Sequence, residues 1–172
     1  MLISLGVVVA VVLITVVSIF TGGQPTNASR NVLVGEQMKG FSLPGLDGGV
    51  ETAPWTSGHK SVLIFFASWC GPCKAEMPKV AAYLRAHDPT PVRVMGVDVN
   101  DPRGAGRAFV KKDGFTYPVA YDLNFAVTSG VFGFGGIPET VFLNARGVVV
   151  QVYFGAIPEK KLAQGLAGLQ SS

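Results

Sequence analysis

The chain has 172 residues, of which 48% are hydrophobic, and a formal net charge of +3 at neutral pH. This length is sufficient for one domain with a proper hydrophobic core. Lys and Arg residues are scattered and not interleaved with aromatic residues, so the composition gives no indication of nucleic-acid binding. The two cysteines lie in a single motif, which leaves no second pair for a structural disulfide.

An apolar run, residues 2–20, opens the chain and contains no charged side chain. As a helix, these residues would span roughly 28 Å, close to the hydrocarbon thickness of a bilayer. A buried core helix would not be apolar on all faces. A cleaved signal peptide usually has a shorter apolar region and a small-residue cleavage site. We therefore expect residues 1–21 to be an uncleaved transmembrane anchor, with a cleaved signal peptide as the alternative.

A segment rich in Gly, Asn, Ser and Thr follows over residues 22–34, and this composition favours a flexible tether. We expect the folded domain to comprise residues 35–172. Its first element is a predicted hairpin, because an Asp-Gly-Gly turn at 47–49 separates the short runs 41–44 and 50–52. The near-continuous apolar run 61–68 then predicts a strand that is covered on both faces.

Two helices are expected around the next strand. The first runs over 72–87 and contains Pro78, which should kink it because proline lacks a backbone donor. The apolar run 92–99 predicts a strand. Asp101 as a cap and Pro102 at the first helical position then predict a second helix, which Gly114 ends.

The remaining elements are shorter. We expect a strand at 118–121, a weak helix at 123–131, two strands at 140–143 and 148–153 joined by a turn, and a last helix from Pro158 to about residue 169. This alternation predicts an α/β domain with three layers and a mixed central β-sheet.

The motif with the clearest chemical meaning follows the apolar strand and reads Trp69, Cys70, Gly71, Pro72, Cys73. Two thiols at this spacing, at the start of a helix, indicate a dithiol–disulfide redox site. Cys70 precedes the helix, so it should be the more exposed thiol and the attacking nucleophile, since the helix N-terminus favours a thiolate. Cys73 lies one turn further and suits the resolving role.

The cysteine pair has two alternative interpretations. Both thiols could be buried and inert. They could also bind a metal, but a zinc site needs four ligands, and the chain offers no second cysteine pair and only His59 and His87. We expect no metal site and no cofactor apart from the Cys70–Cys73 disulfide itself.

Two further groups are candidates for the same site. Glu76 lies one helical turn after Cys73, where a carboxylate could exchange the proton that the reaction requires. A solvent-facing helix glutamate is the alternative. Ile137 and Pro138 follow a pair of glycines, and Pro138 suits the start of a strand or a cis peptide bond, with a trans turn as the default.

Together these motifs resemble the membrane-anchored thioredoxin-like proteins of the TlpA/ResA/CcmG group. The resemblance covers residues 35 to about 169 and depends on three stretches of sequence. They are Phe41-Ser42-Leu43-Pro44, the Cys-x-x-Cys-x-x-Glu-x-Pro pattern at 70–78, and Gly136-Ile137-Pro138-Glu139-Thr140-Val141-Phe142-Leu143.

The resemblance implies a thioredoxin-like fold and further site residues. Pro138 would be a cis-proline facing the cysteines, with Ile137 supplying backbone for substrate pairing. Trp69, Gly71, Pro72 and Glu139 would contribute to substrate binding, and Glu139 could also tune the site. Residues 101–122 would be the insertion that this group carries. Thioredoxin has a buried Asp where Ile64 stands, so Glu76 becomes the expected proton acceptor.

The implied function is a single-pass membrane thiol–disulfide oxidoreductase whose catalytic domain lies outside the cytoplasm. Its expected partners are a disulfide-bearing protein substrate, apocytochrome c in the cytochrome c maturation branch, and a membrane thiol electron-transfer protein that re-reduces it. A disulfide-forming oxidase or a general thiol–disulfide exchanger of the same fold is one alternative. A redox-inactive binding module or metallochaperone is another.

Overall fold

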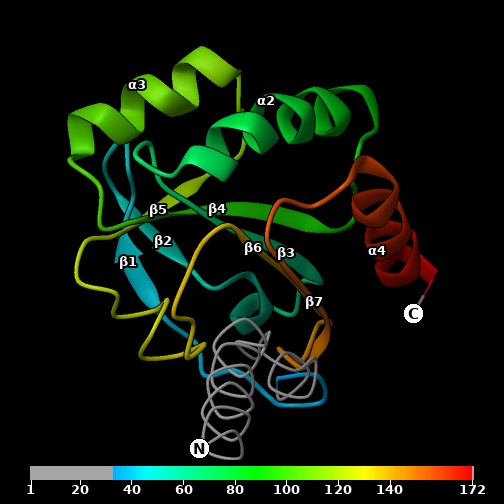
Figure 1. Cartoon of the computed structure of the whole chain (residues 1–172). Coiled ribbons are helices and arrows are strands. Elements are labelled where there is room, and N and C mark those ends of the chain that lie inside the picture. Colours follow the sequence, from blue (N-terminus) through cyan, green and yellow to red (C-terminus); the bar gives the residue numbers. More distant parts are fainter. Residues whose placement is uncertain (1–32, 172) are drawn as a thin grey trace, which may run out of the picture. The chain divides into compact units, whose positions relative to one another are not determined.

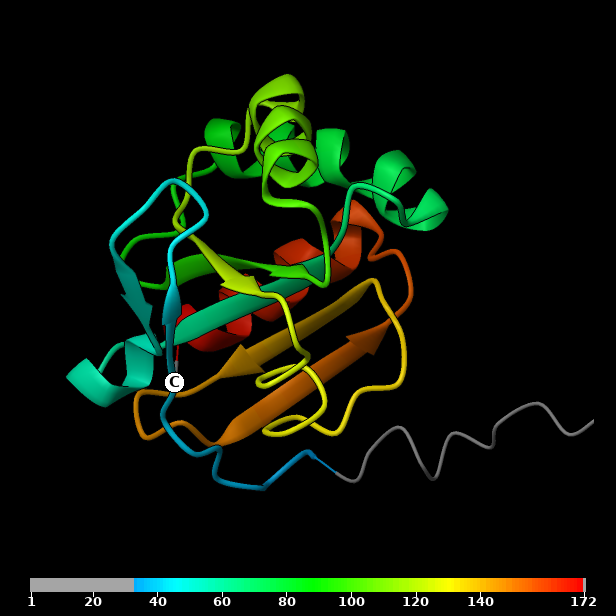
Figure 2. The same cartoon turned by 90° about the vertical axis from the view of Figure 1, so that its left-hand side faces the viewer.

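The structure is a computed structural model that describes residues 33–171 (Figures 1 and 2). The expected anchor, residues 1–21, and all but the last two residues of the expected tether, 22–34, lie outside the described residues. Within residues 33–171, none of the helices has the length and apolar character needed to cross a membrane.

A five-stranded mixed sheet forms the centre of the described region, as the sequence predicts. Its order is β5 (Val119–Asp122), β4 (Arg93–Val99), β3 (Ser61–Phe66), β6 (Glu139–Leu143) and β7 (Val149–Phe154). β3 and β5 run parallel to β4, whereas β6 is antiparallel to both β3 and β7. Every residue of β3 is buried, because the central strand is covered on both faces.

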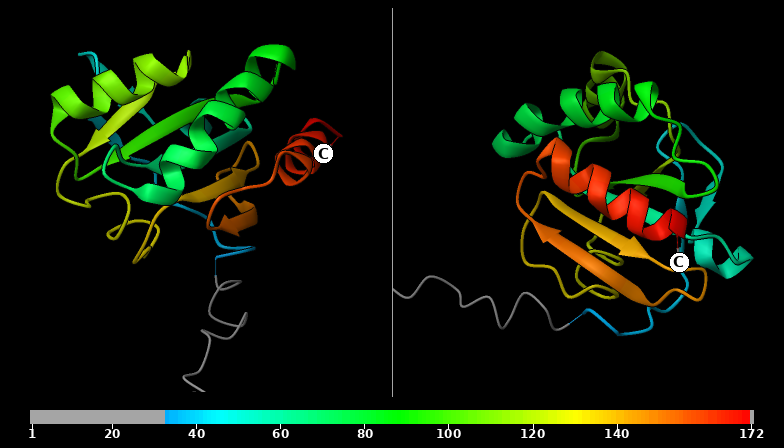
Figure 3. Two further views of the ribbon diagram at one scale, coloured as in Figure 1. Left: turned by 45° about the horizontal axis from the view of Figure 1, so that its top comes forward. Right: turned by 90° about the vertical axis from the view of Figure 1, so that its right-hand side faces the viewer.

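Three α-helices cover one face of the sheet: α2 (Gly71–Ala86), α3 (Arg103–Asp113) and α4 (Glu159–Ser171). They share one apolar cluster with the sheet, to which α2 gives Val80 and Leu84, α3 Phe109 and Val110, and α4 Leu162, Leu166 and Leu169. Figure 3 shows α4 beside β6, where Gly165 packs directly on Phe142. These helix boundaries differ from the predicted ones by one or two residues, which is usual at element ends.

Within the described part of the chain, no α-helix covers the other face of the sheet. Its apolar cluster takes Trp55 from a short 3-10 helix, η1 (Pro54–Ser57), and Val127, Phe132 and Phe134 from the segment between β5 and β6. The helix expected at 123–131 is wrong, because this segment forms successive turns. Phe125 has a positive φ of 56°, and Asp122 accepts hydrogen bonds from the amides of Val127 and Thr128. Both features fix turns and prevent a regular helix.

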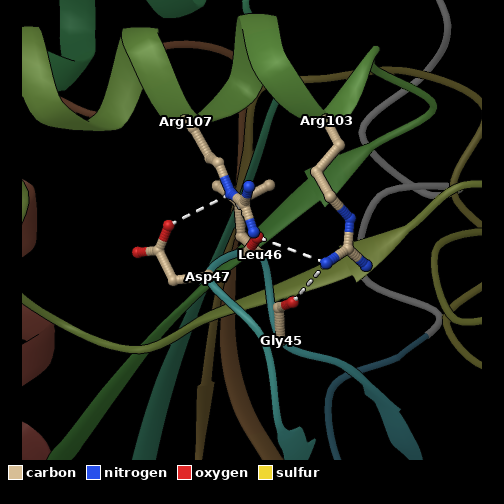
Figure 4. Close-up of polar contacts among 5 residues, drawn as sticks. All are labelled: Gly45, Leu46, Asp47, Arg103 and Arg107. Carbon is tan, nitrogen blue, oxygen red and sulfur yellow. Dashed lines mark hydrogen bonds and ion pairs between the residues drawn. The ribbon is translucent and has the colours of Figure 1, made fainter.

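The predicted N-terminal hairpin is present as β1 (Ser42–Pro44) and β2 (Val50–Thr52), paired antiparallel. Its turn is attached to α3 by two arginines (Figure 4). Arg103 donates to the carbonyl oxygens of Gly45 and Leu46, at 3.1 and 3.4 Å. Arg107 donates to the Leu46 carbonyl at 2.8 Å and forms an ion pair with Asp47 at 3.3 Å.

The ends of α3 follow the sequence prediction only in part. Gly114 ends the helix in a left-handed conformation, as predicted, and its amide bonds back to the last turn. The start differs, because Pro102 occupies the N-cap position and Asp101 does not cap the helix. The Asp101 carboxylate accepts hydrogen bonds from Ser68 instead.

Candidate redox site

The two cysteines meet at the N-terminus of α2 and form a disulfide. Cys70 is the N-cap residue, and its Sγ accepts a hydrogen bond from the backbone amide of Cys73 at 3.2 Å. The partial positive charge of the helix end and this amide both favour a thiolate at Cys70. Cys70 is 4% exposed and Cys73 is fully buried, so Cys70 is the more exposed thiol, as predicted.

Exposed residues flank the more accessible sulfur. Trp69 is 53% exposed, and Gly71 and Pro72 are also at the surface. Pro72 lies in the first turn of α2, where its missing amide removes no helical hydrogen bond. A partner protein can therefore contact the exposed residues beside the disulfide, which are those that the family resemblance implies for substrate binding.

The segment before β6 approaches the same sulfur from the other side. The carbonyl oxygen of Ile137 lies 3.8 Å from Cys70 Sγ. The Ile137–Pro138 peptide bond is cis, as the family resemblance implies and against the trans default. Ile137 is half-buried and Pro138 is buried. The structure thus brings Cys70, Ile137 and Pro138 together although they are far apart in the sequence.

Glu76 is buried on the helix that begins at the cysteines, not exposed to solvent. It lies on α2 at 4% exposure, and its Oε1 accepts a hydrogen bond from the Ile157 amide at 3.0 Å. Its Oε2 has no hydrogen-bond partner among the described residues. Burial raises the pKa of Glu76 to about 7, and the Ile157 amide offsets part of this effect. A carboxyl with this pKa can both hold and release a proton near neutral pH.

Glu139 is also buried, but it belongs to the other face of the sheet. Strand alternation places Glu139 with Val141 and Leu143, which pack in the cluster opposite the helices, whereas both cysteines pack in the helix-side cluster. Burial raises the pKa of Glu139 to about 8. Its direct contact with a substrate and its tuning of the site stay predictions.

A groove lies beside the disulfide. Its volume is about 480 Å³, and its lining includes Trp69, Phe125, Phe134 and Ile137. The backbone of Gly135 and Gly136 completes one wall. The aromatic and aliphatic lining makes this groove suitable for an apolar side chain of a protein substrate.

Two acidic residues near the site were not identified from the sequence as redox residues. The sequence predicts Asp101 as a helix cap and Asp98 only as part of a strand. The structure places Asp101 against Ser68, in the loop that leads to Cys70. The only sequence signal for Asp98 was a carboxylate in an otherwise apolar strand.

Known proteins resemble this chain in sequence and in fold. The family model described as AhpC/TSA family matches residues 34–152. The thiol-disulfide oxidoreductase ResA of Halalkalibacterium halodurans is 27% identical over 130 residues, which are 76% of this chain and 73% of that protein. The protein of the same name from Geobacillus thermodenitrificans is 26% identical, covering 81% of this chain and 79% of its own length.

Solved structures show the same fold. A secreted Mycobacterium tuberculosis disulfide oxidoreductase, described as homologous to E. coli DsbE, superposes with a TM-score of 0.66. It is 25% identical, and the superposition covers 75% of this chain and 96% of that one. StoA from Bacillus subtilis, at 24% identity and a TM-score of 0.64, shares the fold.

Proposed function

This chain belongs to the AhpC/TSA family and is a thiol–disulfide oxidoreductase of the thioredoxin fold, and we propose that it reduces disulfides of apocytochrome c outside the cytoplasm. The observation that carries the proposal is the Cys70–Cys73 pair at the start of α2, with Cys70 Sγ facing the Ile137 carbonyl. This arrangement leaves Cys70, at 4% exposure, as the more accessible of the two sulfur-bearing residues, and Cys73 fully buried.

The proposed reaction starts from the reduced protein. The Cys70 thiolate attacks one sulfur of the substrate disulfide, forms a mixed disulfide and releases the other substrate sulfur as a thiolate. Cys73 then loses its proton and attacks Cys70 Sγ, which closes the Cys70–Cys73 disulfide and releases the second substrate thiolate. Two electrons pass from this protein to the substrate, and both substrate thiolates take up protons.

Glu76 is the proposed acceptor of the Cys73 proton. It follows Cys73 by three residues on α2, so both side chains lie on one side of the helix. Its buried carboxyl, with a pKa of about 7, has one oxygen without a partner among the described residues. Ile64 supports this assignment, because it occupies the position on β3 where thioredoxin has a buried Asp. β3 therefore offers no acid at this position that could accept the proton in place of Glu76.

The finer parts of the proposal concern place and partners. An extracytoplasmic compartment keeps thiols oxidised, so a membrane thiol electron-transfer protein would have to reduce the Cys70–Cys73 disulfide after each turnover. The apolar run at residues 2–20 would tether the domain near such a partner and raise its effective concentration. The name of the secreted Mycobacterium tuberculosis relative supports an extracytoplasmic location.

A trapping experiment tests the proposed substrate. Cys73→Ala in the reduced full chain should form a stable mixed disulfide through Cys70 with a peptide that contains an oxidised Cys-x-x-Cys-His segment, and mass spectrometry would detect it. Cys70→Ala is the matched control and should form none. No adduct with this peptide, together with rapid reduction of insulin, would identify a general exchanger and overturn the apocytochrome c assignment. No reaction with either would favour a redox-inactive binding module.

A further inference from the structure

The loop that follows β4 forms hydrogen bonds with the segment between β3 and α2, which leads to Cys70. The amide and the hydroxyl of Ser68 donate hydrogen bonds to the two carboxylate oxygens of Asp101, at 2.5 and 2.8 Å. The indole Nε1 of Trp69 donates to the carbonyl oxygen of Asn100 at 3.0 Å. Asp101 is 1% exposed, so water competes little with its two bonds. Cys70 follows directly after these two anchored residues.

A second carboxyl lies beside Asp101 in a fully buried position. Asp98 is 0% exposed, and neither of its oxygens has a hydrogen-bond partner among residues 33–171. α3 closes over it at Gly106, where an added Cβ would lie 2.1 Å from Asp98 Oδ2. An ionised carboxylate in such a place is costly. Burial first, and then the neighbouring Asp101, raise the pKa of Asp98 to about 8.

Among residues 33–171, neither Asp98 nor Asp101 forms an ion pair with a charged side chain. Arg103 and Arg107 of α3 donate to the carbonyls of the β1–β2 turn, and Arg107 pairs with Asp47 (Figure 4). From β5, Tyr121 donates its hydroxyl to the backbone carbonyl of Asp101, 2.9 Å away, and its ring stacks with Arg103. On the neighbouring strand β3, the residue that pairs with Asp98 is the apolar Phe66.

We propose that Asp101 is a positioning residue of the redox site: its carboxylate fixes the Ser68–Trp69 segment and thereby Cys70, while Asp98 carries a proton so that the pair holds one negative charge. This inference rests on the proposed redox role of Cys70. It adds a pH limit, because above about pH 8 Asp98 loses its proton. The second negative charge then lies close to the anchored loop and disfavours the Cys70 thiolate.

Three substitutions in the full chain separate the parts of the proposal. Asp98→Asn keeps the size of the side chain and mimics its protonated form. Asp101→Asn replaces the carboxylate with a neutral amide, whose oxygen can accept from the Ser68 amide only while its NH₂ group faces the Ser68 hydroxyl, so neither contact is any longer a bond to a charged group. Asp113→Asn is the matched control: burial also raises the pKa of Asp113, but it lies at the other end of α3.

Amide exchange of Ser68, measured by NMR on the oxidised protein, tests the anchoring independently of sulfur chemistry. Asp101→Asn should speed this exchange by about ten- to a hundredfold, the size expected for one lost bond to a charged group. Asp98→Asn and Asp113→Asn should leave it unchanged. Unchanged exchange in Asp101→Asn would overturn the inference, even if the proposed function held.

Turnover of a disulfide substrate tests the positioning role. Asp101→Asn should lose roughly tenfold or more in kcat, since small misplacements of reacting atoms are costly. Should that variant not fold, Ser68→Ala removes only the hydroxyl bond and should cause a smaller loss. If the Ser68 amide exchanges faster in Asp101→Asn but turnover stays equal to that of the unmodified chain, the positioning role is overturned. If the unmodified chain itself shows no turnover, the proposed function fails, and Ser68 exchange still confirms or overturns the anchoring.

Alkylation of Cys70 in the reduced protein tests the proton on Asp98. In the unmodified chain the alkylation rate should rise less steeply with pH above about pH 8, because Asp98 becomes charged. Asp98→Asn should remove this bend, and Asp113→Asn should keep it. Identical curves for Asp98→Asn and the unmodified chain would contradict the proposed protonation of Asp98.

Discussion

At the scale of single residues, the redox site depends on how its surroundings control the ionisation of Cys70 and Glu76. The sulfur of Cys70 accepts a hydrogen bond from the backbone amide of Cys73, which favours the thiolate form of Cys70. Glu76, one helical turn after Cys73, has one oxygen bonded and one without a partner in the described part of the chain, and burial keeps it protonated up to about pH 7. The surroundings of Cys70 thus favour a thiolate nucleophile at the rim, and Glu76 can accept the Cys73 proton once its own carboxyl has ionised, at about pH 7 and above.

Glu76→Gln should alter the pH dependence of the resolving step. In the unmodified chain, release of the mixed disulfide should accelerate as pH rises through about 7, because the Glu76 carboxylate becomes available as a base. Glutamine cannot accept the proton, so the acceleration near pH 7 should disappear and the rate should fall by about 10²-fold or more. Stopped-flow measurement of mixed-disulfide decay at several pH values gives both the rate and its pH dependence.

The matched control for Glu76 is Glu159→Gln, at the exposed start of α4 and close to the same Ile157 segment. This variant should retain the acceleration near pH 7. A Glu76→Gln profile that coincides with that of the control would return Glu76 to a structural role.

At the scale of elements, α3 and β4 meet at a close contact between Gly106 and Asp98. Gly106→Ala should destabilise the fold by about 1–3 kcal/mol, since the added methyl overlaps the fully buried carboxyl of Asp98 and one of the two must shift. Denaturant unfolding measures this change. The result would bear on the redox loop as well, because the same carboxyl lies next to Asp101.

Gly104→Ala is the control on the same helix. An added Cβ there meets no atom within 4 Å, so the exchange should stabilise α3 by up to about 1 kcal/mol through helix propensity. Equal effects of the two substitutions would show that the contact between α3 and Asp98 is not tight.

The elements also show which predictions a sequence supports. β3 and α2 were predicted well because an unbroken apolar run and a capped helix start are local signals. The helix at 123–131 was wrong because Asp122 folds back on the amides of the following turn. Asp101 was misassigned because its partner, Ser68, lies 33 positions earlier and meets it only through sheet pairing.

At the scale of the whole molecule, three buried carboxyls link stability to pH. The pKa of Glu76 is raised to about 7, and the pKa values of Asp98 and Glu139 to about 8, all mainly by burial. Each group therefore holds its proton more tightly in the folded state than in the unfolded state. Their contribution to stability is fully present below the unfolded pKa and is lost as pH rises through the folded value.

The free energy of unfolding should consequently decrease between about pH 4 and about pH 8 in the oxidised protein. Chemical denaturation at several pH values across this range measures the slope. The triple variant Glu76→Gln, Asp98→Asn and Glu139→Gln should show a flatter dependence. A stability that rises with pH in the unmodified chain would contradict the assignment of these three groups as protonated.

The central claim is that Cys70 and Cys73 open and close reversibly, and a redox titration of the full chain tests it most directly. Mass spectrometry of alkylated samples equilibrated at a series of potentials should show one two-electron transition, with a midpoint nearer about −270 mV than about −120 mV for a reductant. A midpoint near about −120 mV would identify an oxidant and contradict the proposed direction. A pair that stays oxidised, or stays reduced, at every potential would contradict the redox function altogether.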